Sequence, residues 1–538
     1  MKKTLFSLAF ALLVSTFSIA QETTPRTDID LTKWHHMSFE ESGIYGVNTD
    51  KALQFLKDKK IKAQPFVVGV LDSGVEVTHE DLKDNVWVNP KEKKDGVDND
   101  KNGYIDDLHG WNFIGGKDGK NVDADTMELT RLLVKYKKMF ETDKNAESNK
   151  TKFTKEYESY TQLKKEYEEK LAEAKPNASQ YRMIYDNLKT PVDALVKEIG
   201  DKKLTEEFML SFQPQSEVSK QGMMLFAMVP PEAWKGKTMT EFGAEVMSEI
   251  GEVAKHYEDQ VNYHLNLDYD PRAIVGDNYE NIKEHIYGNN DVDGPDSNHG
   301  THVSGIIAAK RNNGIGMDGI AGDGNVKILS VRTVPNGDER DKDVANAIRY
   351  AVDQGAKVLN MSFGKAYSPD KEVVWDAFKY AEKKGVLLIK AAGNDDLNID
   401  VDIHYPTVYN DKGEAVSNNV ITVGSSTSDP LVLKSSFSNY GKKSVDVFAP
   451  GSEIYSAIPT RDGKYKSNSG TSMASPVVAG VAALIWSHYP SLTASQVKQI
   501  IMESVNKNDQ LKEISVTGGV VDAYKAVQLA DKMVSKKK

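Results

Sequence analysis

The sequence predicts an α/β protein: a mostly parallel, twisted sheet flanked by helices, interrupted by a long α-helical insert. Two observations support this class. Short apolar runs typical of buried strands alternate with helical segments on both sides of one long segment. Between them, over residues 120–285, hydrophobic side chains recur at helical spacing. With 538 residues, 39% of them hydrophobic, the chain is long enough to form more than one compact unit.

The first predicted strand is the continuous apolar run at residues 66–71, which follows a predicted helix over residues 49–59. A run without polar alternation is typical of a strand buried on both faces. It ends at Asp72, followed by Ser73 and Gly74. A carboxylate there lies at the edge where open α/β sheets place their active sites. Asp-Ser-Gly is also ordinary turn chemistry, so Asp72 alone does not identify a site.

The next feature is an acidic loop. Oxygen-bearing residues stand at positions 1, 3, 5 and 9 of a segment with glycine at position 6, namely Asp98, Asp100, Asn102 and Asp106. This spacing resembles the start of a calcium-binding loop. Position 12 is His109 rather than a bidentate glutamate, so the loop is not a standard EF-hand. We predict Ca²⁺ here, with a solvated acidic turn as the alternative.

The insert over residues 120–285 is predicted to be helical throughout. The aromatic and aliphatic residues of one predicted helix are Phe153, Tyr157, Tyr160, Leu163, Tyr167 and Leu171. We interpret this stripe as core packing rather than a ligand site. Thr190 and Pro191 have the pattern of an N-cap followed by proline at the first helical position, which predicts the start of a new helix there.

Strands and helices alternate again after the insert. Further strands are predicted at residues 326–331, 357–361, 386–391, 420–423 and 445–448, and a helix at 371–384. This alternation is typical of a parallel sheet with helices on both faces.

Three polar residues lie next to these elements. His299 precedes an apolar helical run at 306–309, Asn394 follows a predicted strand, and Ser472 precedes the apolar helix 477–486. A serine at a helix start lies near unpaired backbone N–H groups and the positive end of the helix dipole. That environment suits a nucleophile whose attack creates an oxyanion, to which the Asn394 carboxamide can donate.

Three short motifs resemble the active-site signatures of subtilisin-like serine proteases (subtilases, peptidase family S8). They are Leu71-Asp72-Ser73-Gly74, His299-Gly300-Thr301-His302 and Gly470-Thr471-Ser472-Met473-Ala474, in the family's order Asp, His, Ser. The resemblance implies a subtilisin-like three-layer fold. It also implies a serine endopeptidase that hydrolyses the peptide bonds of proteins through an acyl-enzyme.

The resemblance implies a role for each matching residue. Ser472 would be the nucleophile, His299 the general base and Asp72 the residue that orients the imidazole. Asn394 and the backbone N–H of Ser472 would form the oxyanion hole. The two walls of the substrate cleft would be Ser362, Phe363 and Gly364 on one side and Ala391, Ala392 and Gly393 on the other. A second Ca²⁺ site is implied at Asp81 and Asn313, with Glu41 as a third ligand, and no organic cofactor is expected.

The predicted organisation has five parts. They are a signal peptide (1–20), a short N-terminal extension (21–40), a peptidase domain (41–119 and 286–530), the helical insert (120–285) and a basic tail (531–538). Lys2 and Lys3, the apolar run after them and the small residues ending at Ala20 indicate a cleavable signal. We therefore expect export from a bacterial cell, to the periplasm or the medium. Because few residues precede the first strand, we hypothesise that the insert covers the cleft or assists folding in place of a propeptide.

Composition limits the partners. The net charge of −11 argues against nucleic acid as a partner, and the resemblance implies protein or peptide substrates. The chain contains no cysteine, so neither disulfides nor a lipid-modified cysteine anchor is expected, and no stable membrane anchor is predicted. The oligomeric state is not determined. Two alternatives are an inactive protease scaffold whose insert binds a partner, and a hydrolase of small esters or amides.

Overall fold

The computed structural model describes residues 30–536. The predicted signal peptide, the first part of the N-terminal extension and the last two residues of the basic tail lie outside this range. The described chain divides into two compact units. One contains residues 30–128 and 270–536, and the other is Leu129–Tyr269.

A nine-stranded sheet organises the larger unit, in the order β10-β11-β7-β6-β5-β4-β1-β3-β2. The strands are β1 (Phe66–Asp72), β2 (Gly110–Asn112), β3 (Val326–Arg332), β4 (Val358–Met361), β5 (Leu387–Ala391), β6 (Val420–Ser426), β7 (Val447–Pro450), β10 (Asn506–Lys507) and β11 (Gly519–Val520). Neighbouring strands are parallel except β10 and β11, which are antiparallel. The predicted α/β fold class with a mostly parallel sheet is confirmed.

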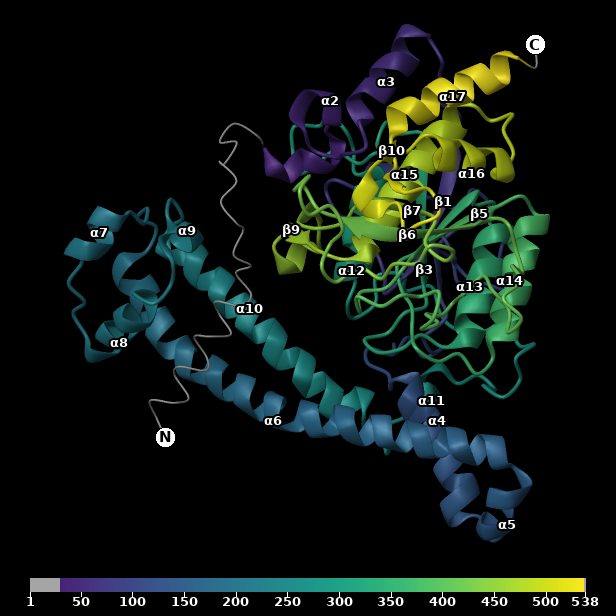
Figure 1. Cartoon of the computed structure of the whole chain (residues 1–538), viewed down its shortest axis with the longest axis horizontal. Coiled ribbons are helices and arrows are strands. Elements are labelled where there is room, and N and C mark those ends of the chain that lie inside the picture. Colours follow the sequence, from purple (N-terminus) through teal and green to yellow (C-terminus); the bar gives the residue numbers. More distant parts are fainter. Residues whose placement is uncertain (1–29, 537–538) are drawn as a thin grey trace. The chain divides into compact units, whose positions relative to one another are not determined.

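Helices cover both faces of this sheet (Figure 1). Helices α12 (Asn298–Ala308) and α15 (Thr471–His488) pack on one face, and α13 (Asp341–Asp353) and α14 (Lys371–Lys383) on the other. Each face has its own apolar core because the strands are buried on both sides. The remaining helices of this unit are η1 (Leu31–His36), α2 (Phe39–Ser42), α3 (Thr49–Asp58), η2 (Lys83–Asn85), α11 (Arg272–Val275), η5 (Thr460–Asp462), α16 (Ala494–Glu503), η6 (Asp509–Leu511) and α17 (Ala523–Ser535).

The strand order brings distant segments to one edge of the sheet. β1 lies between β3 and β4, although the chain reaches those strands only after the insert. Leu71 of β1 pairs with Met361 of β4, which pairs with Lys390 of β5. The carboxyl ends of β1, β4 and β5 therefore lie side by side, where open α/β sheets bind their ligands.

Two helices begin earlier than their apolar runs predicted. α12 starts at Asn298 and α15 at Thr471, so His299 and Ser472 lie in the first turns rather than ahead of the helices. Small and polar residues continue a helix here because the turns pack against the sheet. The short strands β2, β10 and β11 and the hairpin of β8 (Ile454–Ala457) and β9 (Tyr465–Asn468) were not predicted. Segments of two to four residues are too short to show a periodic pattern.

The smaller unit is helical. It contains α4 (from Glu128 to Lys137), η3 (Lys138–Thr142), α5 (Ala146–Lys152), α6 (Thr154–Ile199), α7 (Glu206–Ser211), α8 (Glu217–Phe226), α9 (Pro231–Trp234), α10 (Met239–Asp259) and η4 (Gln260–His264). Within it, α6 and α10 form a long pair, and α8 packs on α6 (Figure 1). Buried aromatic side chains, including Phe226, Trp234 and Phe242, form its core. No helix of residues 30–536 has a stretch long and apolar enough to cross a membrane.

The prediction that a new helix begins at Thr190 and Pro191 is wrong. Helix α6 runs through both Pro176 and Pro191 without a break. Pro191 is buried, and α8 lies close against it, since a Cβ at Gly222 would lie 2.8 Å from the Pro191 carbonyl oxygen. Tertiary packing here outweighs the cost of proline inside a helix, a cost of about 3 kcal/mol.

The ends of the insert differ from the predicted bounds of 120 and 285. The helical unit spans Leu129–Tyr269, and the flanking residues belong to the sheet-containing unit. Arg340, just before α13, pairs with both Asp125 (2.8 Å) and Asp270 (3.1 Å). Lys365, next to the predicted wall residue Gly364, pairs with Glu128 at 2.8 Å. These ion pairs hold the chain on either side of the insert in the larger unit.

Candidate active site

Asp72 and His299 lie in direct contact. Asp72 ends β1, its side chain is 2% exposed, and its Oδ1 accepts a hydrogen bond from the Ser73 backbone N–H. The same Oδ1 lies 2.7 Å from Nδ1 of His299, which is in the first turn of α12. A glycine must follow the histidine, because a Cβ at position 300 would lie 2.1 Å from the carbonyl oxygen of Gly74. The backbone can therefore approach closely enough for the two side chains to meet.

This contact controls the charge of the imidazole. Burial lowers the pKa of His299, but the negative charge and hydrogen bond of Asp72, with a further contribution from Asp296, outweigh it. The net result is a pKa above the usual 6.5. The neighbouring His302 differs, because burial lowers its pKa to about 3 and its Nε2 lies 3.0 Å from the Lys466 carbonyl oxygen. His302 is therefore uncharged at neutral pH and serves the packing of α12.

Ser472 lies in the first turn of α15, where hydrogen bonds tie it to the end of β4. Its Oγ donates to the carbonyl oxygen of Ser362 at 3.1 Å, and Ser362 Oγ donates to the Ser472 carbonyl oxygen at 2.8 Å. The structure gives no hydrogen bond between Ser472 and His299, both of which it describes. Helices α12 and α15, which carry them, pack against each other on the same face of the sheet.

Asn394 is oriented by the residue before the serine. Its Oδ1 accepts hydrogen bonds from Thr471 N (2.9 Å) and Thr471 Oγ1 (2.8 Å). With the oxygen engaged, Nδ2 is the group that remains available as a donor, and it would lie 3.6 Å from a Cβ built on Gly470. The exposed carboxamide thus presents its N–H₂ beside the start of α15.

The predicted substrate walls follow β4 and β5. Ser362, Phe363 and Gly364 continue from β4, and Ala391, Ala392 and Gly393 from the end of β5. Thr471 Oγ1 accepts from Gly393 N at 3.1 Å, which joins the second wall to α15. Sequence reasoning missed His404, whose ring lies between the walls. A Cβ at Gly364 would be 2.1 Å from its Cε1, and one at Gly393 would be 2.8 Å from its Nε2. No motif marks this histidine.

Comparison with known proteins identifies the family. The sequence pattern of the subtilase family matches residues 64–520. The chain belongs to the subtilase family. Over 236 residues it is 43% identical to thermitase from Thermoactinomyces vulgaris, covering 43% of this chain and 75% of that protein. It is 40% identical over 254 residues to a thermophilic serine proteinase from Bacillus sp. (strain AK1), covering 46% of this chain and 56% of that protein.

A third relative extends the comparison. The cell wall-associated protease of Bacillus subtilis (strain 168) is 36% identical over 237 residues, which cover 44% of this chain and 24% of that protein. The predicted family is confirmed, and this subtilase is a serine-type endopeptidase. The chain spans three quarters of thermitase but only about half and a quarter of the other two relatives.

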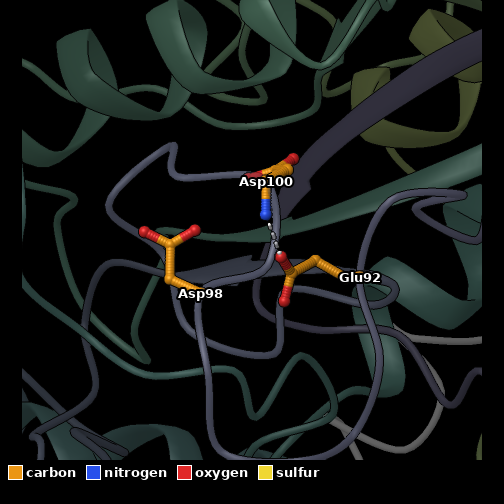
Figure 2. Close-up of side chains that lie close together, drawn as sticks. All are labelled: Glu92, Asp98 and Asp100. Atoms are coloured by element: carbon orange, nitrogen blue, oxygen red, sulfur yellow. Dashed lines mark hydrogen bonds between the residues drawn. The ribbon is translucent and has the colours of Figure 1, made fainter.

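The acidic loop of this subtilase brings together three carboxylates, drawn in Figure 2. Ligand oxygens of Glu92, Asp98 and Asp100 lie within 4.8 Å of one another. Glu92 was not among the predicted ligands, because it precedes the loop and reaches it only through the fold. Its Oε1 accepts from the backbone N–H of Asp100 at 2.9 Å. Carboxylate oxygens are the donors that Ca²⁺ prefers, so the group fits that ion.

The side-chain oxygens of the other two predicted residues of the loop accept hydrogen bonds elsewhere. Asp106 Oδ1 accepts from the backbone N–H groups of Asp95 and Gly96, at 3.1 and 3.0 Å. Asn102 Oδ1 accepts from Tyr104 N at 2.7 Å. The structure thus places Asp98 and Asp100 with Glu92, and uses Asp106 and Asn102 to hold the loop.

The second predicted calcium site is brought together in part. Asn313 Nδ2 donates to Asp81 Oδ1 at 2.6 Å, and Met317 N donates to Asp81 Oδ2 at 3.0 Å. Glu41 instead forms an ion pair with Lys51 at 2.9 Å, and no contact joins it to Asp81 in the described chain. Burial raises the pKa of Asp81 despite these hydrogen bonds, which marks a carboxylate that a cation would stabilise.

Proposed function

We propose that this chain is an exported serine endopeptidase that cleaves peptide bonds of proteins through an acyl-enzyme on Ser472. The observation that carries the proposal is the 2.7 Å contact of Asp72 with His299, two residues 227 positions apart. A nucleophilic serine needs a base oriented by a third group, and this pair supplies the base with its orienting carboxylate.

The first half of the proposed reaction begins with a proton transfer. In the proposal, Ser472 Oγ exchanges its hydrogen bond to the Ser362 carbonyl oxygen for one to Nε2 of His299. His299 accepts the hydroxyl proton as Oγ bonds to the substrate carbonyl carbon, and Asp72 stabilises the imidazolium. Collapse of the tetrahedral intermediate breaks the C–N bond, and the imidazolium gives its proton to the leaving amine. Water then attacks the acyl-enzyme by the same steps, releasing the acid.

Charge on the attacked oxygen is stabilised at the start of α15. In the proposal, the backbone N–H of Ser472 and Nδ2 of Asn394 donate to the oxyanion. The hydrogen bonds from Thr471 to Asn394 Oδ1 support this role because they leave the donor end of the carboxamide toward the site. Donors held in place before the reaction cost no reorganisation during it. The peptide would extend between the two walls and pair with their backbone.

An active-site label tests the proposal. A fluorophosphonate should react with the wild-type chain at Ser472 and should not react with a Ser472→Ala variant. Asn394→Ala should be labelled about 100-fold more slowly, because the phosphoryl oxygen loses one donor. Peptide mass spectrometry maps the labelled residue. If the wild type and Ser472→Ala were labelled equally, Ser472 would be excluded as the nucleophile. An unlabelled, folded wild type would favour the inactive scaffold.

Export and calcium binding are further parts of the proposal. Residues 1–20 have the sequence of a cleavable signal, and mass spectrometry of the mature N-terminus should find Gln21 first. The mature protein would be periplasmic or secreted.

Calcium should stabilise the fold through the acidic loop. Glu92, Asp98 and Asp100 would hold the ion, which supplies positive charge among three carboxylates. At a Ca²⁺ concentration of about 100 Kd, the stabilisation expected is about 2.7 kcal/mol. We expect chelation to lower the Tm of the Ser472→Ala protein, which cannot digest itself. Glu92→Gln should bind one ion fewer in equilibrium dialysis, whereas Asp118→Asn, an exposed control, should not. If Glu92→Gln bound as many Ca²⁺ ions as the unmodified protein, this loop would be excluded as a Ca²⁺ site.

A further inference from the structure

Lys390 is a buried lysine without a partner. It is the fourth residue of β5, immediately before the wall residue Ala391, and it is 2% exposed. Its ammonium makes no hydrogen bond or ion pair within residues 30–536. Buried lysines are almost always paired, because removing an ammonium from water without compensation is costly. An unpaired lysine beside a substrate wall is therefore a group that an anionic side chain would stabilise.

The direction of the Lys390 side chain follows from the sheet. Side chains alternate along a strand, so Lys390 lies on the same face as Leu388. That face is packed against α13 and α14 and includes Met361, the residue paired with Lys390, and Phe363 of the first wall. Lys390 thus lies on the α13 and α14 face of β5, one residue before the second wall continues from the strand end.

His404 connects this lysine to the space between the walls. Its ring lies against both Gly364 and Gly393, and its Nδ1 is buried without a hydrogen-bond partner in the described chain. Burial first, and then the positive charge of Lys390, lower the pKa of His404 to about 3. The imidazole is therefore neutral and has one N–H to donate. We call His404 and Lys390 together the basic pocket floor.

The acidic groups near this floor form no ion pair with Lys390 in the described chain. Glu339 and Asp446 are the acidic groups whose charge acts on Lys390, and neither forms an ion pair with it. Burial raises the pKa of Glu339 to about 8, so its carboxyl group is mostly protonated at neutral pH. Asp446 accepts from Thr422 N at 2.8 Å, and its charge keeps the pKa of Lys390 higher than burial alone would. Burial lowers the pKa of Lys390 to about 8, which leaves its ammonium charged at pH 7.

We propose that the pocket between the two walls selects substrates with a carboxylate side chain, glutamate or aspartate, at the residue whose carbonyl is attacked (P1). Lys390 pairs with that carboxylate and His404 donates a hydrogen bond to it. The inference rests on the proposed function, because it takes residues 362–364 and 391–393 as the substrate walls. An apolar P1 side chain would leave the Lys390 ammonium buried and unpaired. Such a substrate would gain no binding energy from the lysine.

Paired peptides test this selectivity. Two peptides that differ only in P1 glutamate or glutamine should differ in kcat/KM by about 100-fold at pH 7 in favour of glutamate, as expected for a buried charge pair. Lys390→Met should bring this ratio to about 1, because kcat/KM for the glutamate peptide loses the contribution of the charge pair. The control Lys498→Met removes a half-buried lysine that donates to the Val420 carbonyl oxygen, and should keep the ratio. A wild-type ratio near 1, or an unchanged ratio in Lys390→Met, overturns the inference.

The pH dependence of the same ratio needs no variant. Both peptides share the catalytic groups, so titration of His299 cancels between them. As pH rises through about 8, Lys390 loses its proton and the preference for glutamate should fall. A wild-type ratio that stays constant from pH 6.5 to 9.5 contradicts the proposal even if Lys390→Met does not fold. Fluorophosphonate labelling separates the two hypotheses: labelled protein without glutamate preference refutes the pocket assignment alone, and unlabelled protein refutes the proposed function.

Discussion

Replacing His299 by alanine is expected to lower kcat for peptide hydrolysis by about four to six orders of magnitude. The loss arises because Ser472 then has no base to accept its proton. Ser472→Ala should cost a similar factor, and the double variant should be no slower than the slower single variant, since the two residues act as one unit. Steady-state kinetics on one peptide, with protein purified away from host proteases, measures all three.

The control for this experiment is His285→Ala, which removes an exposed histidine outside the site. Its kcat should match the wild type. Circular dichroism should show the same fold for every variant, because His299 is 40% exposed and its removal leaves no large cavity. If the double variant were slower than each single variant by the product of their separate effects, Ser472 and His299 would act independently, and the triad would be excluded.

Asp72→Asn is expected to lower kcat by about 10⁴ and to move the acid limb of the pH profile. Asp72 raises the pKa of His299, so activity in the wild type should rise with pH through a value above 6.5, as the imidazole loses its proton. Asparagine removes the negative charge that favours the imidazolium. The pKa of His299 should therefore fall, and the acid limb should shift to lower pH.

The measurement is kcat/KM against pH from 4 to 9 for the wild type and Asp72→Asn, since kcat/KM reports the free enzyme. Asp296→Asn is the matched control, because Asp296 also raises the pKa of His299 but does not contact the ring in the described structure. The Asp296→Asn variant should shift the acid limb of the pH profile slightly and leave the maximal rate unchanged. An acid limb at the same pH in Asp72→Asn would contradict the role of Asp72.

Much of the fold could be predicted from local patterns. The strands around residues 66, 326, 358, 387, 420 and 447 are apolar runs, and such runs identify buried strands wherever they occur. Asp72, Asn394 and Ser472 could be singled out because each lies close to the end or the start of a regular element. These patterns can be recognised from the sequence because each depends on the backbone conformation and side-chain polarity of a few consecutive residues.

Other features depended on residues far apart in the chain. Pro191 has the local pattern of a helix start, yet packing against α8 keeps α6 continuous. Glu92 joins Asp98 and Asp100 only because the loop folds back on it. His404 carries no local signal, and its place between Gly364 and Gly393 arises from contacts between three separate loops.

The sequence by itself determined the class of the sheet, the family and the order of the three motif residues, because apolar runs and short motifs are local properties of the chain. Only the tertiary structure decided that Asp72 meets His299, that Ser472 is held by Ser362, and that Lys390 is buried without an ionic partner. The physical reason is that hydrogen bonds, ion pairs and desolvation depend on distances in space, which the strand order and helix packing set.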